Sequence, residues 1–91
     1  MKIRFRQEAE LELQDALAWY EHCAAGLGGR FLEALDDCLD RIVRFPQAYP
    51  LVRGQARRAL LQQFPYSLVF LIEADGILII SCRHFRQRSP Q

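Results

Sequence analysis

The sequence predicts an α+β domain with the element order β-α-α-β-β-β, in which an antiparallel helical hairpin packs on one face of a small, mostly antiparallel sheet. Two patterns predict this class. Apolar residues recur at helical spacing in the first half of the chain, and continuous apolar runs typical of strands fill the second half. With 91 residues, of which 51% are hydrophobic and 25% charged, residues 1–91 have the size and composition of one globular domain.

The first strand and first helix follow from a change of period. Residues 2–5, KIRF, alternate basic and apolar side chains, which predicts a short, half-exposed strand. From residue 7 to residue 24 the apolar residues share one helical face. Four acidic residues lie off that face: Glu8, Glu12, Asp15 and Glu21.

A second helix follows after a glycine-rich turn. Residues 26–29, GLGG, favour the left-handed backbone at which helices end. A second apolar stripe runs from Phe31 to Phe45, and Pro46 prevents its continuation. Since the connection is so short, the two helices are expected to form an antiparallel hairpin.

The remaining segments predict a loop and three strands: residues 46–54 (PQAYPLVRG) as the loop, then 56–64, 66–74 and 77–85 as strands. Asp75-Gly76 is a strong hairpin signal between the last two strands, because a two-residue turn of this kind needs positive φ at both positions. No internal repeat or linker divides the chain.

The last two strands carry more apolar surface than two helices can cover. A strand covered on one face alternates apolar and polar residues, whereas SLVFLI and ILII are continuous. The residues expected on the face away from the helices include Val69, Leu71, Leu78 and Ile80. Large bare apolar patches are rare on monomers, so we expect a partner chain to bind there, with coverage by the 46–52 segment as the alternative.

Cysteine and histidine spacing predicts no metal site and no cofactor. Cys23, Cys38 and Cys82 are odd in number and isolated, so they predict neither a disulfide framework nor a zinc site, and we expect all three in the core. His22 and His84 have no metal-ligand spacing to each other or to a cysteine.

The net charge of +1 hides a strong asymmetry along the chain. Residues 1–6 carry three basic groups, residues 7–40 carry nine acidic groups against one basic, and residues 41–91 carry eight arginines against two acids. The fold could therefore present an acidic helical side and a basic side that attracts a polyanion. The sequence has no secretory signal at its start and no apolar run of membrane-spanning length, which predicts a cytoplasmic protein.

The end of the last strand carries the residues best suited to bind phosphate: Arg83, His84, Arg86 and Arg88. Arginine clamps phosphate and histidine titrates near neutrality, so part of a metal-independent ribonuclease site is present. A second proton-transfer group is missing, because no Lys follows Lys2 and no Tyr follows Tyr66. A solvated basic strand end is the alternative interpretation.

Two further arginines, Arg57 and Arg58, begin the first strand of the second half. If three antiparallel strands follow in order, this start lies near the start of the last strand rather than near His84. We therefore expect two basic clusters at opposite ends of the sheet.

Several segments together resemble the RelE/ParE toxin superfamily of bacterial type II toxin–antitoxin systems, and specifically its ParE-like branch. They are LQDALAWYE, GLGGRFLEALDDCLDRI with FPQAYPLV, RRALLQQFPYSLVF, and RHFRQRSP. The resemblance spans nearly the whole chain and implies a β-α-α-β-β-β toxin. The chain departs from many relatives in ending RQRSPQ where they place two adjacent arginines, an acid and a tryptophan.

The resemblance implies a cognate antitoxin whose C-terminal segment wraps the toxin in a hetero-oligomer. ParE-like members inhibit DNA gyrase, arrest growth and stabilise plasmids, whereas RelE-like members cut messenger RNA on the ribosome. The first reading expects no catalytic residues and target contacts through Arg83, His84, Arg86 and Arg88. The alternative expects ribonuclease residues Arg57, Arg58, Arg83 and His84. In both, the antitoxin is expected on Val69, Leu71, Leu78 and Ile80.

Overall fold

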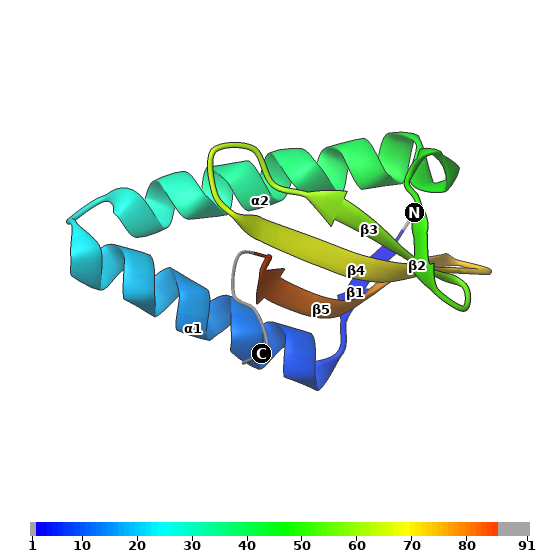
Figure 1. Ribbon diagram of the computed structural model, residues 1–91, viewed down its shortest axis with the longest axis horizontal. Coiled ribbons are helices and arrows are strands. Elements are labelled where there is room, and N and C mark those ends of the chain that lie inside the picture. Colours follow the sequence, from blue (N-terminus) through cyan, green and yellow to red (C-terminus); the bar gives the residue numbers. More distant parts are fainter. Residues whose placement is uncertain (1, 86–91) are drawn as a thin grey trace, which may run out of the picture.

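The computed structural model describes residues 2–85, which form two α-helices and a five-stranded sheet (Figure 1). The elements are β1 (Lys2–Phe5), α1 (Gln7–Cys23), α2 (Leu27–Arg44), a short 3₁₀ helix η1 (Pro46–Ala48), β2 (Leu51–Arg53), β3 (Ala56–Leu60), β4 (Tyr66–Glu73) and β5 (Gly76–His84). The strand order is β1-β5-β4-β3-β2. β1 runs parallel to β5, and all other neighbours are antiparallel. The predicted fold class is confirmed.

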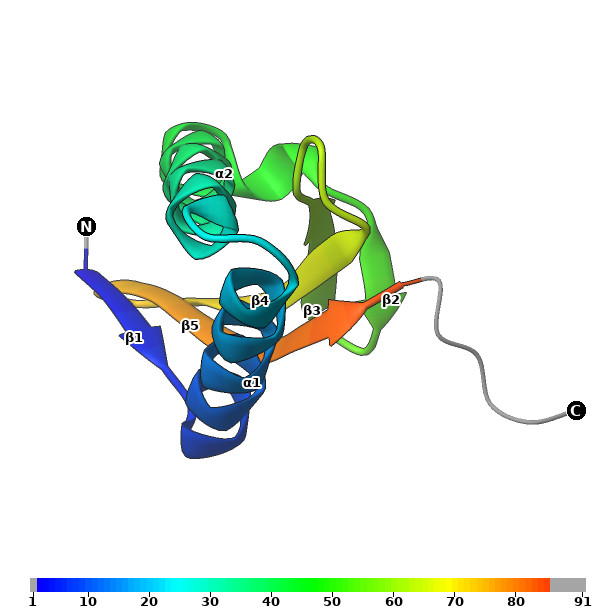
Figure 2. The same ribbon diagram turned by 90° about the vertical axis from the view of Figure 1, so that its left-hand side faces the viewer.

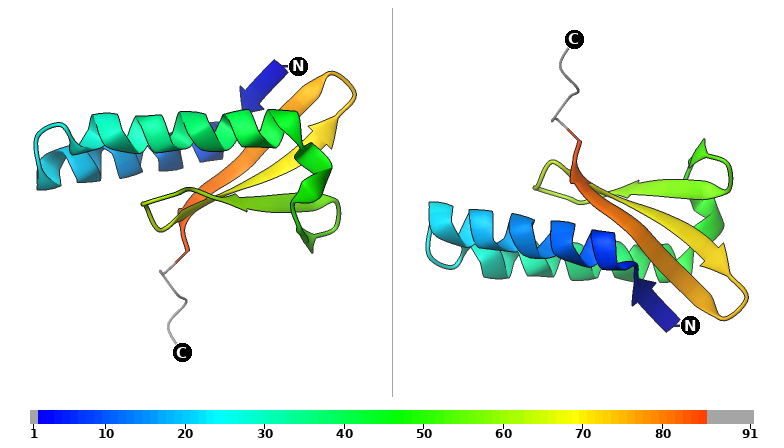
Figure 3. Two further views of the ribbon diagram at one scale, coloured as in Figure 1. Left: turned by 90° about the horizontal axis from the view of Figure 1, so that it is seen from above. Right: turned by 90° about the horizontal axis from the view of Figure 1, so that it is seen from below.

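Both helices cover the same face of the sheet, and they run antiparallel to each other (Figures 2 and 3). The largest fully buried side chains come from α2, β4 and β5: Phe31, Phe70, Ile42, Leu68, Ile77 and Ile79. Each contributes about 1.5–3 kcal/mol through burial, which explains why the helical and strand periods of the sequence converge on this layer.

An aromatic cluster closes the core at the end near the helical turn. Tyr20 stacks on Phe31 with ring centroids 5.2 Å apart, and Phe64 meets both rings edge-on. Tyr66 adds a fourth ring from the start of β4. Such pairs contribute about 0.5–1.5 kcal/mol each beyond burial, so this cluster fixes where α1, α2 and the loop before β4 meet.

The turn between the helices is tighter than the sequence predicted, because α2 begins at Leu27 and Gly28 lies within it. Gly26 supplies the left-handed backbone, with φ of +88°. The Glu21 carboxylate accepts hydrogen bonds from the N–H groups of Gly26 (3.1 Å) and Gly28 (2.9 Å). These backbone bonds hold the pKa of Glu21 below its usual value.

The loop expected at residues 46–54 contains η1 and the edge strand β2, so that part of the prediction was incomplete. β3 also ends at Leu60, earlier than expected. The chain leaves the sheet there because Leu61 and Phe64 turn back into the core. Gln63, with φ of +73°, makes this reversal possible.

The hairpin between β4 and β5 differs from the expected turn. Glu73 pairs with Gly76, so Ala74 and Asp75 form the turn. Among the described residues only Gly26, Gly54 and Gln63 have positive φ, so the expected left-handed pair at 75–76 is wrong. Gly76 is needed for another reason, because a Cβ there would lie 2.0 Å from the carbonyl oxygen of Lys2 in β1.

A β-bulge in β5 changes which side chains face the helices. Ile79 and Ser81 pair with consecutive residues of β4, so Ile80 is an extra residue between them. Strict alternation would place Cys82 on the same face as Leu78 and Ile80. The bulge instead turns Cys82 into the helix-covered core, where it is 1% exposed.

The cysteines divide by their position in the fold. Cys38 and Cys82 are buried, as expected, but Cys23 is exposed, so its expected place in the core was wrong. Cys23 is the last residue of α1, at the tip of the helical hairpin that projects beyond the sheet (Figures 1 and 3). No sheet residue reaches that tip to cover it.

The charge asymmetry of the sequence is also a difference between the helices and the sheet. Every acidic residue of segment 7–40 falls in α1 or α2. Of the described arginines of segment 41–91, Arg53, Arg57, Arg58 and Arg83 lie in strands, whereas Arg41 and Arg44 lie in α2. Within residues 2–85, neither helix combines the length and the hydropathy needed to cross a membrane.

Candidate functional site

The sheet face away from the helices carries a stripe of four half-buried apolar side chains, which we call the apolar stripe: Val69, Leu71, Leu78 and Ile80. Leu71 pairs directly with Leu78 across β4 and β5. An ion pair between Arg4 and Glu73 borders the stripe near the β4–β5 turn. No helix of the described residues covers this face, so the side chains are placed as the sequence predicted (Figure 2).

A hollow of about 480 Å³ opens at one end of the apolar stripe, and we call it the basic hollow. It is lined by Arg6, Val52, Arg53, Ala56, Arg58, Ser67, Val69, Ile80, Ser81, Arg83, His84 and Phe85. Four of these residues are arginines, and no described lining residue is acidic. The hollow is therefore suited to an anion, since nothing in its lining opposes negative charge.

Sheet register brings Arg58 into the basic hollow. Arg58 pairs with Val69, and Val69 pairs with Ser81, so Arg58 lies two strands away from the segment that carries Arg83. The expectation of two basic clusters at opposite ends of the sheet was wrong for this residue. The error came from the predicted length of this strand, which was 56–64. β3 ends at Leu60 and therefore pairs with a different part of β4 than expected.

Arg57 points to the other face and has a structural role. Its Nη1 donates to the backbone oxygens of Gln47 (3.3 Å) and Tyr49 (2.7 Å), which fastens η1 to β3. The structure therefore separates Arg57 from Arg58, although the alternative ribonuclease site had grouped them. Arg86 and Arg88, two of the expected target-binding residues, lie outside the described residues.

A second hollow, of about 680 Å³, lies between α1 and the end of β5, and we call it the α1 groove. It is lined by Glu12, Asp15, Ala16, Trp19, Tyr66, Cys82, Arg83 and His84. Trp19 is 61% exposed. Arg83 and His84 line both hollows, so the end of β5 separates the basic hollow from the α1 groove.

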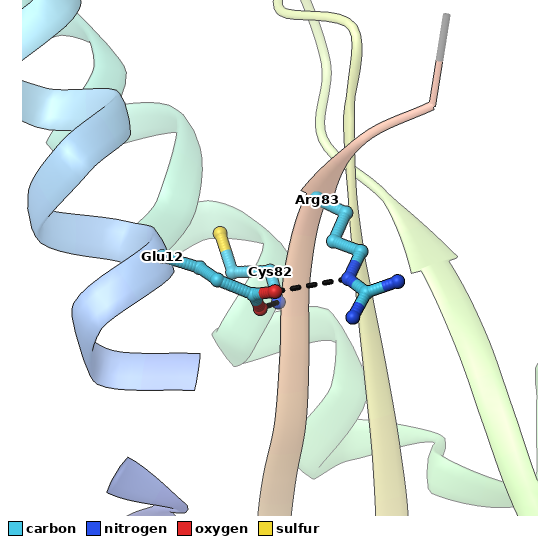
Figure 4. A network of polar contacts seen from close by, with 3 residues as sticks. All are labelled: Glu12, Cys82 and Arg83. Atoms are coloured by element: carbon cyan, nitrogen blue, oxygen red, sulfur yellow. Dashed lines mark hydrogen bonds and ion pairs between the residues drawn. The ribbon is translucent and has the colours of Figure 1, made fainter. Parts of the chain in front are cut away.

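Glu12 links α1 to this strand end (Figure 4). One carboxylate oxygen accepts from the Cys82 backbone N–H at 2.9 Å, and the other accepts from Arg83 Nε at 2.9 Å. β1 pairs with β5 only as far as Ile79, so the side of β5 beyond it is open to α1. Glu12 occupies the place that a longer β1 would fill.

The two hydrogen bonds of Glu12 contribute differently to the stability of the fold. The exposed ion pair with Arg83 contributes about 0–1 kcal/mol, whereas leaving a buried backbone N–H such as that of Cys82 unpaired costs about 1–3 kcal/mol. This role was not predicted from the sequence, in which Glu12 is one of four acidic residues off the apolar face of the helix. The signal for this role is the difference in strand length. β1 has four residues and β5 has nine, so part of the edge of β5 needs another hydrogen-bonding partner.

The Cys82 thiol is not a reactive group. Burial raises its pKa to about 12, and the neighbouring Glu12 carboxylate adds to the effect. Burial also raises the pKa of Cys38, against the opposing effect of Arg41. Both thiols stay protonated near neutral pH and act as core residues.

Tyr66 lies directly opposite His84 in the β4–β5 ladder, with ring centroids 5.2 Å apart. Tyr66 precedes the last strand in the sequence, but the antiparallel pairing of β4 with β5 brings it beside His84. Burial raises the pKa of the Tyr66 phenol, and the nearby Asp15 contributes in the same direction. The phenol therefore stays protonated near neutral pH and is a weaker acid than an exposed tyrosine.

The chemistry available at the strand end is that of binding more than of proton transfer. Arginine stays charged at any physiological pH and cannot act as an acid or base. His84 is the one histidine of the basic hollow's described lining. Across residues 2–85, no three His, Cys, Asp or Glu side chains gather where they could hold a metal ion.

Comparison with known proteins gives a family and a fold. The family model described as "ParE toxin of type II toxin-antitoxin system, parDE" matches residues 3–88. A chain of the chromosomal ParDE toxin–antitoxin system from P. aeruginosa superposes with a TM-score of 0.65 at 18% identity, covering 92% of this chain and 95% of that one. A chain of the intact E. coli RelBE toxin–antitoxin complex gives a TM-score of 0.63 at 20% identity, covering 88% and 90%. A search of curated proteins by sequence finds no match.

Proposed function

The chain belongs to the ParE toxin family of type II toxin–antitoxin systems, and from this premise we propose that it inhibits DNA gyrase in the cytoplasm. We propose further that a cognate antitoxin neutralises it within a hetero-oligomeric complex. Gyrase is the target that the resemblance to ParE-like toxins implies. The chain would act on it by binding rather than by catalysis.

The observation that carries this proposal is the composition of the basic hollow. Arg6, Arg53, Arg58 and Arg83 supply fixed positive charge, and His84 is the one histidine among the described lining residues. Such a surface can hold DNA phosphates or an acidic protein surface beside the enzyme. Cleavage of RNA without a metal needs an acid and a base in addition to cations, and this hollow's described lining offers no such pair.

The apolar stripe supports the antitoxin part of the proposal. Val69, Leu71, Leu78 and Ile80 form a row that no helix of residues 2–85 covers. An extended or helical segment from another chain would gain stability by covering this row. The P. aeruginosa ParDE and E. coli RelBE structures both come from toxin–antitoxin systems, which agrees with a partner of this kind.

Gyrase assays test the proposal directly. The purified chain is added to DNA gyrase with relaxed plasmid and ATP, and supercoiling and cleaved plasmid are followed on gels. We expect supercoiling to fall and cleaved plasmid to accumulate, and Arg58→Ala to weaken both effects. Arg30→Ala, which removes an exposed arginine of α2, is the matched control and should act like the wild type. Unchanged gyrase activity at saturating wild-type chain would rule the proposal out.

A second candidate is a metal-independent endoribonuclease that cuts messenger RNA on the ribosome. The observation that favours it is the pairing of Tyr66 with His84 beside Arg83 in the α1 groove. Histidine as base, tyrosine as acid and arginine as phosphate clamp would together supply the three roles that cleavage needs. Arg57 has no part in this version, because it binds backbone oxygens on the helix-covered face.

Messenger RNA mapping during expression of the chain separates the two candidates. A ribonuclease would produce codon-positioned cuts that disappear in both Tyr66→Phe and His84→Ala. Tyr66→Phe retains the aromatic ring and its packing, so a loss of cutting in this variant would report on the phenol itself. Intact messages in growth-arrested cells would remove the ribonuclease candidate and leave gyrase inhibition.

A further inference from the structure

The guanidinium of Arg83 is hydrogen-bonded through its Nε and not through its Nη groups. It is 73% exposed, and such a long exposed side chain ordinarily samples many rotamers. Its Nε donates to Glu12 at 2.9 Å, and the bond drawn to that carboxylate comes from Nε and not from either Nη group (Figure 4). The Nη groups therefore remain available to a ligand in the basic hollow, which Arg83 helps to line.

Glu12 is itself held firmly. Its second carboxylate oxygen accepts the backbone N–H of Cys82, the residue that the bulge turns into the core. Its side chain is 29% exposed, much less than that of Arg83. Glu12 therefore bonds at once to the backbone of β5 and to the guanidinium that follows it, and this fixes the direction in which the guanidinium leaves the strand.

We propose that Glu12 is a positioning residue that preorganises Arg83 to bind a DNA phosphate at the basic hollow. This inference rests on the proposed function, in which that hollow contacts DNA beside gyrase. An arginine whose Nε is already fixed loses less side-chain freedom when its Nη groups clamp a phosphate. Glu12 touches no ligand in this role and acts only through Arg83.

The proposal predicts an effect opposite in sign to that of simple electrostatics. Removing a carboxylate makes the protein more positive, which by itself strengthens binding to DNA. If Glu12 instead positions Arg83, its replacement weakens binding although the net charge rises. The sign of the change therefore distinguishes a positioning residue from a carboxylate that merely lowers the charge of the strand end.

The experiment measures the affinity of the full chain for a short fluorescein-labelled DNA duplex by anisotropy at fixed salt. We expect Glu12→Gln to weaken binding about three- to tenfold, because the freed side chain must be ordered again on binding. Glu8→Gln, one turn earlier on α1, removes the same charge and should leave affinity unchanged or slightly higher. Gln can still accept the Cys82 N–H, so the variant should fold, and thermal unfolding checks this.

Two further variants complete the test. Glu12→Asp keeps the charge but shortens the reach, so it should weaken binding at constant net charge. In the Arg83→Ala background, Glu12→Gln should have no further effect, because the group that it positions is gone.

The inference is overturned if Glu12→Gln binds the duplex as tightly as the wild type or more tightly. It is equally overturned if Arg83→Ala leaves affinity unchanged, or if the loss caused by Glu12→Gln persists in that background. A wild-type chain that binds the duplex as predicted but leaves gyrase unaffected would instead remove the proposed function and not the Glu12–Arg83 relationship.

Discussion

Arg57 and Arg58 are neighbours in the sequence and lie on opposite faces of the sheet. Arg57 binds the backbone oxygens of Gln47 and Tyr49 on the helix-covered side, whereas Arg58 lines the basic hollow. Alternation along β3 produces this division, and it separates a residue that holds the fold from one that faces a ligand.

Paired alanine substitutions at these two positions should therefore give opposite results. Arg58→Ala should weaken gyrase inhibition about tenfold, the worth of a charge-assisted contact, without changing stability. Arg57→Ala should lower the free energy of unfolding by about 1–2 kcal/mol and leave the inhibition by folded protein unchanged. Urea unfolding and supercoiling titrations measure the two quantities. Equal loss of inhibition in both variants would contradict the assignment of faces.

The apolar stripe predicts where an antitoxin binds. Val69→Glu should weaken the complex with a cognate antitoxin by tenfold or more, because it places a charge against an apolar partner. Ile72→Glu is the matched control, since Ile72 lies in the same strand but is oriented with Leu68 and Phe70. Isothermal titration calorimetry measures both affinities. A folded Val69→Glu chain with undiminished affinity would move the antitoxin site elsewhere.

Two glycines should respond to alanine in opposite directions. A Cβ at Gly76 would lie 2.0 Å from the Lys2 carbonyl oxygen, so Gly76→Ala must separate β1 from β5 and should cost about 3 kcal/mol. Gly29 lies in α2 with open space at the Cβ position, so Gly29→Ala should stabilise the fold by about 0.5–1 kcal/mol. Chemical denaturation of both variants provides the comparison. A Gly76→Ala chain as stable as the wild type would contradict the close approach of β1.

Stability at acidic pH should report on the helical turn. Hydrogen bonds from Gly26 and Gly28 lower the pKa of Glu21 in the folded state, so its ionised form favours folding. This contribution is present above the ordinary glutamate pKa and is lost as the pH falls through the lowered one. Glu21→Gln should therefore be less stable than the wild type at neutral pH, and the difference should vanish in strong acid.

Urea unfolding at a series of pH values measures this difference. Glu33→Gln, at an exposed position in α2, removes the same charge away from the turn and serves as the control. A stability difference for Glu21→Gln that stays constant down to strong acid would show that the carboxylate has no special role there.

Thiol labelling should distinguish the three cysteines. Cys23 is exposed and should react rapidly with an aromatic disulfide reagent at neutral pH. Cys38 and Cys82 are buried, and the Cys82 pKa is raised to about 12, so both should react only as fast as the chain unfolds. Cys23→Ser should abolish the rapid phase. A second rapidly reacting thiol in the native protein would contradict the burial of this pair.

Much of the fold was predictable because it follows local periods. The apolar spacing of α1 and α2 and the continuous runs of β4 and β5 placed each major element within a few residues. The sequence even predicted the uncovered stripe of Val69, Leu71, Leu78 and Ile80, since strand alternation divides those runs between two faces. Element boundaries were less accurate, because packing of Phe64 and Gly28 decides them.

The candidate site was harder to predict because it depends on register between distant strands. One extra residue, Ile80, turns Cys82 inward and leaves Arg83 beside Glu12, and no local pattern shows such a bulge. The pairing of Tyr66 with His84 likewise follows only once the β4–β5 turn is known. Sequence periodicity identified the right strand end but could not say which side chains meet there.

The parallel pairing of β1 with β5 means that the sheet cannot be completed until β5 has been translated. Lys2 and its neighbours are translated about seventy residues before their hydrogen-bonding partners, which run from Gly76 to Ile79. β1 therefore stays without its partner strand until β5 has been synthesised. A message cut short before β5 would yield a product in which β1 has no neighbouring strand and β4 has lost one of its two partners.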